Sequence, residues 1–208
     1  MKNLADTNAD AQTIAIYDTQ AMQYRDSVAE NTDTNLQPFI DSFDRGSRIL
    51  DFGCGVGNAA GKMHEAGLVV DAADASEGML ALAAEYQGIN LIQMQFSDLN
   101  AVAYYDGIWA NFSLLHALKS EMAGILSSVY TALKPDGIFF MALKKGHGES
   151  RDELGRRYAY YTQDECEQTL ADAGLEIYRI TSGSGTGLAG TRSEWIGFFT
   201  RKPGSDTD

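Results

Sequence analysis

The chain has 208 residues, of which 44% are hydrophobic and 22% are charged, and its formal net charge is −13. The hydrophobic share excludes a wholly disordered protein, and the acidic excess disfavours binding to nucleic acid or to an anionic membrane surface. No apolar run approaches the roughly 20 residues of a membrane-spanning helix, and residues 1–10 lack the pattern of a secretory signal. We therefore expect a cytoplasmic protein. The two cysteines, Cys54 and Cys166, are far apart and predict neither a disulfide nor a metal site.

Helical spacing marks the beginning of the chain. Apolar and aromatic residues recur there at steps of three and four, namely Ile14, Tyr17, Ala21, Tyr24 and Val28. This spacing predicts one or two amphipathic helices, and Pro38 is expected to open a further short helix that ends at Phe43. We interpret residues 1–45 as a small N-terminal helical cap.

From residue 46 onward, short β-rich apolar runs alternate with helical stretches, which predicts an α/β fold with a mainly parallel sheet. The expected strands are 48–52, 68–73, 90–95, 106–111, 138–143, 175–181 and 194–200. The Thr162-x-x-Glu165 pattern predicts a capping box at a helix start. The Gly/Ser-rich run 182–190 is expected to be the loop between the last two strands. Residues 46–202 form the predicted main domain, and 203–208 a disordered tail.

Three alternating glycines follow the first predicted strand, in the order Asp51, Gly53, Gly55 and Gly57. Glycines allow a tight turn and a close approach of the backbone to a ligand, and the helix that follows offers free N–H groups. The turn therefore indicates a nucleotide-like ligand. A dinucleotide fingerprint would need a glycine where Asn58 stands, which disfavours a nicotinamide-dependent oxidoreductase.

Further motifs follow at regular intervals and extend the pattern. Asp74 ends the second predicted strand, Phe96-Ser97-Asp98 follows the third, and the segments 105–116 and 133–137 surround the fourth strand and precede the fifth. Together with the glycine turn they resemble the class I (Rossmann-like) S-adenosylmethionine-dependent methyltransferases over residues 47–143. The resemblance implies a mostly parallel seven-stranded sheet with helices on both faces and an antiparallel last strand. The segment 144–158 and the strand of Trp195 are similar to small bacterial methyltransferases of the tellurite-resistance type.

The resemblance also implies a cofactor site for S-adenosylmethionine, with S-adenosylhomocysteine as the product and no metal. Asp74 would accept hydrogen bonds from both ribose hydroxyls, Asp98 would accept one from the adenine amine, and Met79 would line the adenine. The expected cofactor-binding residues are Tyr24, Asp51, Gly53, Cys54, Gly55, Gly57, Asp74, Ala75, Ser76, Met79, Phe96, Ser97, Asp98 and Asn111.

The expected reaction is an in-line methyl transfer to a small-molecule acceptor, with neither nucleic acid nor membrane as a partner. His116 follows the fourth strand and is the candidate general base, because histidine titrates near neutrality; an acceptor that loses no proton would need no base. The candidate acceptor-binding residues are Tyr17, His116, Arg157, Tyr158 and Tyr160. A protein that binds S-adenosylmethionine without catalysis is the alternative.

Overall fold

A seven-stranded sheet forms the centre of the computed structural model, which describes residues 10–28 and 33–204. The strand order is β3-β2-β1-β4-β5-β9-β8. The strands are β1 (Arg48–Phe52), β2 (Val69–Asp74), β3 (Asn90–Gln93), β4 (Tyr105–Asn111), β5 (Leu133–Lys144), β8 (Glu176–Thr186) and β9 (Arg192–Arg201). Strands β1 to β5 are parallel, and β9 is antiparallel to both β5 and β8. The predicted fold class, including the antiparallel last strand, is confirmed.

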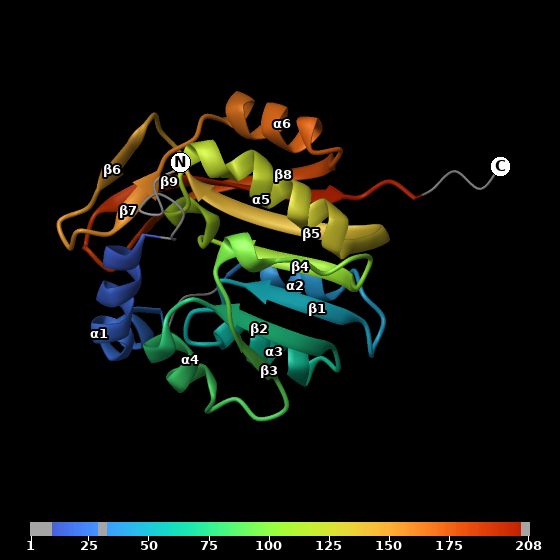
Figure 1. Ribbon diagram of the computed structural model, residues 1–208, viewed down its shortest axis with the longest axis horizontal. Coiled ribbons are helices and arrows are strands. Elements are labelled where there is room, and N and C mark those ends of the chain that lie inside the picture. Colours follow the sequence, from blue (N-terminus) through green and yellow to red (C-terminus); the bar gives the residue numbers. More distant parts are fainter. Residues whose placement is uncertain (1–9, 29–32, 205–208) are drawn as a thin grey trace, which may run out of the picture.

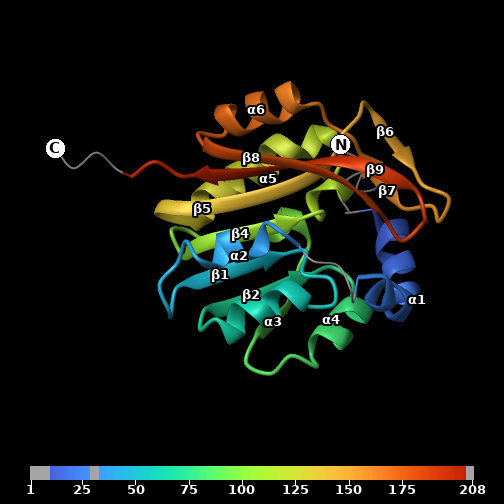
Figure 2. The ribbon, with the colours of Figure 1, turned by 180° about the vertical axis from the view of Figure 1, so that it is seen from behind.

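Helices cover both faces of the sheet. Helices α5 (Lys119–Ala132) and α6 (Gln163–Asp172) lie on the face toward the viewer in Figure 1. Helices α2 (Leu36–Ile40) and α3 (Asn58–Glu65) lie on the other face, which Figure 2 shows. The predicted capping box begins α6, because Thr162 accepts a hydrogen bond from the Glu165 N–H and Glu165 accepts one from the Thr162 N–H. Each face therefore has its own hydrophobic core.

Helix α1 (Ala11–Val28) lies outside these two layers. It runs past one end of the sheet, beside α4 (Glu77–Ala83) and a small hairpin, in both views (Figures 1 and 2). Its backbone leaves the helical region at Gln20, with φ −114° and ψ 17°, so the helix has two halves. Within the predicted cap, α2 differs from α1, because Leu36 and Phe39 are buried in the core of one sheet face. The cap as a separate unit stays a prediction.

Two parts of the C-terminal third differ from the sequence prediction. The hairpin of β6 (Glu149–Arg151) and β7 (Arg157–Ala159) was not predicted. The predicted loop at 182–190 is wrong in its first half, because β8 continues to Thr186 and pairs with β9. Gly183 permits this pairing, since its missing side chain leaves space for the ring of Trp195. Glycine thus serves close packing here rather than a turn.

Some predictions concern residues that the structure does not describe. Residues 1–9 and 29–32 of the predicted cap, and 205–208 of the predicted tail, lie outside the described residues. Within the described part of the chain, no helix combines the length and the apolar character that crossing a membrane requires.

Candidate active site

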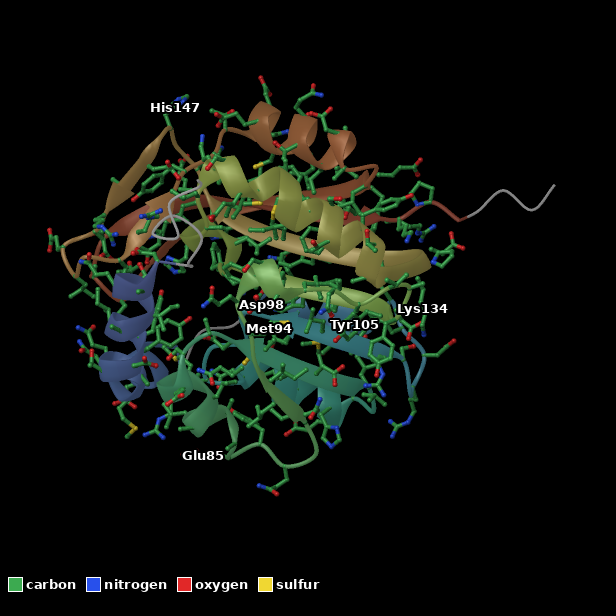
Figure 3. All side chains as sticks on the ribbon, viewed as in Figure 1. Glu85, Met94, Asp98, Tyr105, Lys134 and His147 are labelled. Carbon is green, nitrogen blue, oxygen red and sulfur yellow. The ribbon has the colours of Figure 1, made fainter. Side chains whose placement is uncertain are left out.

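A cavity of about 480 Å³ opens at the carboxyl ends of β1, β2 and β4. Strand β1 pairs with β2 on one side and β4 on the other, so the connections leave it in opposite directions. This switch point is where open α/β sheets bind ligands. Helix α1 and the first turns of α5 complete the cavity wall. Tyr105 and Lys134 mark the opposite end of the sheet in Figure 3.

The glycine turn forms one part of the wall. Gly53, Gly55 and Gly57 have φ angles of 86°, 52° and 85°, a region that side chains with a Cβ disfavour. The Gly53 and Cys54 N–H groups donate to the Ala73 carbonyl at 2.8 and 2.9 Å, which ties the turn to β2. A Cβ on Gly53 would collide with the side chain of Ser113. The turn therefore keeps its shape only with glycine at this position.

Asp74 faces the turn from the end of β2. Its two carboxylate oxygens accept hydrogen bonds from the Gly55 and Ser76 N–H groups, both at 2.9 Å. Burial raises the pKa of Asp74, while these backbone donors lower it and so oppose that effect. The donors hold the carboxylate in one orientation at the cavity wall, where a ligand hydroxyl can reach it.

Two buried oxygen atoms near the turn lack a hydrogen-bond partner among the described residues. Burial and the neighbouring charge of Asp74 raise the pKa of Asp51 to about 7. The Oδ2 atom of Asp51 and the Oδ1 atom of Asn111 are buried without a hydrogen-bond partner among the described residues. The Asn111 amide is oriented by Nδ2, which donates to Asp33 at 2.7 Å. Unpaired acceptors and uncompensated negative charge fit a cationic ligand with amino hydrogens, as S-adenosylmethionine is.

An apolar section of the wall adjoins Asp74. Met79, Met94 and Phe96 line it, and Phe96 packs edge-to-face on Phe52 with ring centroids 5.0 Å apart. These side chains fit the flat face of a nucleobase. Asp98 is placed differently: its exposed carboxylate accepts from the Gln95 N–H at 2.9 Å and does not line the cavity (Figure 3).

The structure brings most of the predicted cofactor residues to one cavity. Those in its wall are Tyr24, Gly53, Gly55, Asp74, Ala75, Met79, Phe96, Ser97 and Asn111. Those outside its wall are Asp51, Cys54, Gly57, Ser76 and Asp98. Ser76 instead caps α4, since its hydroxyl accepts from the Met79 N–H at 3.1 Å. The roles of all these residues toward the cofactor stay predictions.

Tyr17 and His116 meet in another part of the cavity wall. The Tyr17 hydroxyl lies 2.8 Å from Nε2 of His116, and Nδ1 of His116 lies 2.6 Å from the Arg157 carbonyl. A carbonyl only accepts, so Nδ1 carries the proton and Nε2 accepts from Tyr17. Burial lowers the pKa of His116 to about 4, and the charges of Arg156 and Lys144 add to this effect. His116 is therefore neutral at neutral pH.

The other predicted acceptor residues lie outside the cavity wall, and two of them contact His116. Arg157, Tyr158 and Tyr160 do not line the cavity. Tyr158 packs edge-to-face on His116 with ring centroids 4.8 Å apart, and Arg157 contributes only its backbone to the histidine. The sequence analysis assigned these three side chains to acceptor binding, and that role stays a prediction, since none of them lies in the cavity wall.

Several lining residues were missed by the sequence analysis. On α1 they include Thr13 and Ile14, which precede Tyr17 by four and three residues and so share its helix face; this spacing was the available signal. On α5 they are Ser120, Glu121, Gly124, Ile125 and Ser128. Among the described residues, no group of three or more His, Cys, Asp or Glu side chains is arranged to hold a metal ion.

Comparisons with known proteins give a consistent family. Residues 49–137 match the family described as a methyltransferase domain. A protein of Geobacillus sp. (strain WCH70) named as a methyltransferase is 25% identical over 209 residues, covering 74% of this chain and 84% of the relative.

Solved structures share the fold at low sequence identity. The Burkholderia thailandensis 1,6-didemethyltoxoflavin-N1-methyltransferase, solved with 1,6-didemethyltoxoflavin and S-adenosylhomocysteine, has a TM-score of 0.72 and 21% identity, covering 93% of this chain and 88% of that one. The [4+2]-cyclase SpnF has a TM-score of 0.70 and 20% identity, covering 93% and 96%. Because the second protein is named for another reaction, these two likenesses support the fold alone.

The family match covers the glycine turn, Asp74 and the strand before His116, but not α1, which completes the cavity wall. It favours a methyltransferase over the oxidoreductase and the non-catalytic alternatives. The narrower resemblance to the tellurite-resistance type stays a prediction. The match to a methyltransferase domain over residues 49–137, the seven-stranded sheet and the cavity at its switch point together support a class I S-adenosylmethionine-dependent methyltransferase.

Proposed function

We propose that the enzyme methylates a small molecule that binds beside Tyr17 and His116 and gives up a proton in the reaction. One observation carries this proposal: the glycine turn, Asp74, Tyr17 and His116 all line a single cavity of about 480 Å³. This volume lies within the range of about 300 to 1,000 Å³ that is usual for small-molecule sites. The net charge of −13 further disfavours a nucleic-acid acceptor.

Different residues bind the cofactor and accept the proton in this proposal. When bound, S-adenosylmethionine supplies a methyl group on a positively charged sulfur. Asp74 and the glycine turn hold ribose and the amino-acid end, so that binding free energy is used to orient the reactants. The acceptor atom forms its bond to the methyl carbon as the sulfur–carbon bond breaks, and the acceptor's proton passes to the Tyr17–His116 pair.

His116 suits an acceptor whose acidity rises during the transfer. It is the only residue with a basic side-chain nitrogen in the described cavity wall, and its low pKa makes it a weak base. A weakly basic nitrogen, such as one in or attached to an aromatic ring, becomes strongly acidic as it gains a methyl group, and a weak base can then take its proton. An aliphatic ammonium would hold its proton too tightly for His116, and a thiolate or a tertiary amine has no proton to give. An N–H compound with a weakly basic nitrogen is thus the favoured acceptor class.

The binding half of the proposal is tested by calorimetric titration with S-adenosylmethionine, S-adenosylhomocysteine and NAD. We expect both sulfur nucleosides to bind and NAD not to bind. The transfer half is tested by following S-adenosylhomocysteine release over a panel of small N–H, O–H and S–H compounds, with tRNA and denatured protein included. Release that depends only on the macromolecules would overturn the small-molecule proposal.

His147→Gln provides a matched control for His116→Gln. His147 lies exposed at the outer edge of the β6–β7 hairpin (Figure 3), so its replacement removes an imidazole far from the cavity. We expect about a hundredfold lower turnover for His116→Gln and none of this loss for His147→Gln. Equal turnover of the two variants would contradict the role of His116.

A further inference from the structure

Arg156 is a buried cation next to the Tyr17–His116 pair. It lies just before β7, and its side chain is only 2% exposed. A buried charge is tolerated when it is paired and its hydrogen-bond donors are used. Nε and Nη2 of Arg156 donate to Oδ2 of Asp152 at 3.0 and 2.6 Å. Oδ1 of Asp152 accepts from the backbone N–H groups of Leu154 and Arg156. These hydrogen bonds fix the Arg156–Asp152 ion pair within the β6–β7 hairpin.

The remaining arm of the guanidinium reaches the acceptor end of the cavity. Nη1 of Arg156 donates to the Tyr17 hydroxyl at 3.0 Å. A tyrosine hydroxyl carries one proton and accepts through its lone pairs. Neutral His116 carries its proton on Nδ1, so the 2.8 Å contact between Nε2 and the Tyr17 hydroxyl is made by the Tyr17 proton. Arg156 can only donate to this hydroxyl, and Tyr158 is its further hydrogen-bond partner.

Charged and aromatic groups from four segments face His116. Tyr17 contacts it from α1 and Tyr158 from β7, and the Arg156 guanidinium lies 5.3 Å from the centroids of both tyrosine rings. Lys144 of β5 sits 3.9 Å over the Tyr158 ring. The charges of Arg156 and Lys144 oppose protonation of His116, and that of Asp152 favours it.

We propose that Arg156 is a positioning residue for the proton acceptor of the methyl transfer: it aims the Tyr17 hydroxyl at His116 and keeps the imidazole neutral until the acceptor's proton arrives. This inference rests on the proposed role of His116. The acceptor's proton goes to the Tyr17 oxygen while the Tyr17 proton moves to Nε2, so the imidazolium holds the one proton that the acceptor has lost. Release of this proton to water restores the pair.

Nuclear magnetic resonance of the histidines tests the inference without an identified acceptor. The chain has only three histidines, so the His116 signals can be assigned from the spectrum of His116→Gln. The complex with S-adenosylhomocysteine is titrated with acid. In the wild type we expect the tautomer with the proton on Nδ1 and no protonation of His116 above about pH 5. Ordinary titration near pH 6.5, or the opposite tautomer, would overturn the proposal.

Substitutions at Arg156 test its part directly. Arg156→Met removes the charge and the donor to Tyr17, and we expect the His116 pKa to rise by about one unit or more. Arg156→Lys keeps the charge, so the His116 pKa should stay close to its wild-type value. Arg192→Met removes an exposed cation from β9 and serves as the control, with no change expected.

A second substitution at Arg156 keeps the test usable if Arg156→Met does not fold. Arg156→Gln removes the charge and retains a donor, so the same upward shift is expected even if Arg156→Met does not fold. S-adenosylhomocysteine affinity, which depends on the other end of the cavity, should stay within about twofold in every folded variant. An unchanged His116 pKa in a folded Met or Gln variant would overturn the inference. Failure of the wild type to bind the nucleoside would instead overturn the proposed function.

Discussion

The two ends of the cavity are built in different ways. At the cofactor end, the glycine turn and Asp74 present backbone groups and a carboxylate at the ends of neighbouring parallel strands. At the acceptor end, Tyr17, His116 and Arg156 come from α1, the turn after β4 and the β6–β7 hairpin, and side chains connect them to one another and to the hairpin backbone. The first end is fixed by the sheet, whereas the second depends on how three separate segments pack.

This difference predicts different responses to substitution. A change in the glycine turn alters the backbone and should reduce stability and cofactor binding together. A change at the acceptor end removes a side-chain contact and should reduce turnover while leaving cofactor binding intact. Four experiments compare the two ends on this basis.

The largest effect is expected at Gly53. Alanine there would combine a left-handed φ of 86° with a collision against Ser113, and we expect the free energy of unfolding to fall by about 2 to 4 kcal/mol. Gly124→Ala is the control, because this helical glycine also lines the cavity but has open space at its Cβ; it should stabilise the protein by up to about 1 kcal/mol. Urea unfolding of both variants gives the comparison, and equal stabilities would show that the turn is not tightly packed.

Tyr17→Phe tests the acceptor end. The substitution keeps the ring and removes the hydroxyl that joins Arg156 to His116. We expect turnover to fall by about ten- to a hundredfold, with S-adenosylhomocysteine affinity within about twofold of wild type. Steady-state kinetics and calorimetry on the same preparation separate the two quantities. A parallel loss of affinity would mean that the two ends are not independent.

Asp74→Ala tests the cofactor end beyond the turn. We expect S-adenosylhomocysteine affinity to fall by at least about tenfold, because two ribose hydroxyls lose a charged acceptor. Asp98→Ala provides the contrast. The sequence analysis assigned Asp98 to the adenine amine, but its carboxylate caps the short 3-10 turn Phe96–Asp98 and does not line the cavity. A change below about twofold is therefore expected for Asp98, and a tenfold loss would restore the original assignment.

The smallest effect is a dependence of stability on pH. His116 has a folded-state pKa of about 4, below its unfolded value. The contribution of neutral His116 to the free energy of unfolding is therefore fully present above about pH 6.5. It is lost as the pH falls toward 4, because over this range only the unfolded chain takes up the proton. Between pH 7 and 5.5 this loss amounts to about 1 kcal/mol. His116→Gln should show a smaller fall than His147→Gln over this range, and identical slopes in chemical unfolding would contradict the buried neutral state.

The cofactor end was largely predictable from sequence because its residues are close in the chain or end adjacent parallel strands. Gly53, Gly55 and Asp74 were assigned to one crevice on this basis, and they line one cavity. The acceptor end was less predictable. Tyr17 and His116 were both proposed, but their contact joins residues 99 positions apart. The role of Arg156 depends on a hairpin that short, polar strands did not reveal.

The placement of Asp98 has a related cause. A motif predicts which loop follows a strand, but local hydrogen bonds decide where each side chain of that loop points. The carboxylate of Asp98 accepts a hydrogen bond from the Gln95 N–H at the start of its turn, which competes with any contact in the cavity. Ser97, its neighbour, does line the cavity.

Helix α1 is attached at both ends of the site. Thr13 accepts from the Arg157 N–H at the hairpin, and Asp18 accepts from Ser76 and Gly78 directly beyond Asp74. The stretch of α1 between Thr13 and Asp18 therefore sets the spacing between the two ends of the cavity. A shift of this helix as a rigid unit would displace the wall at both ends together, whereas the loss of a single side chain from it would not.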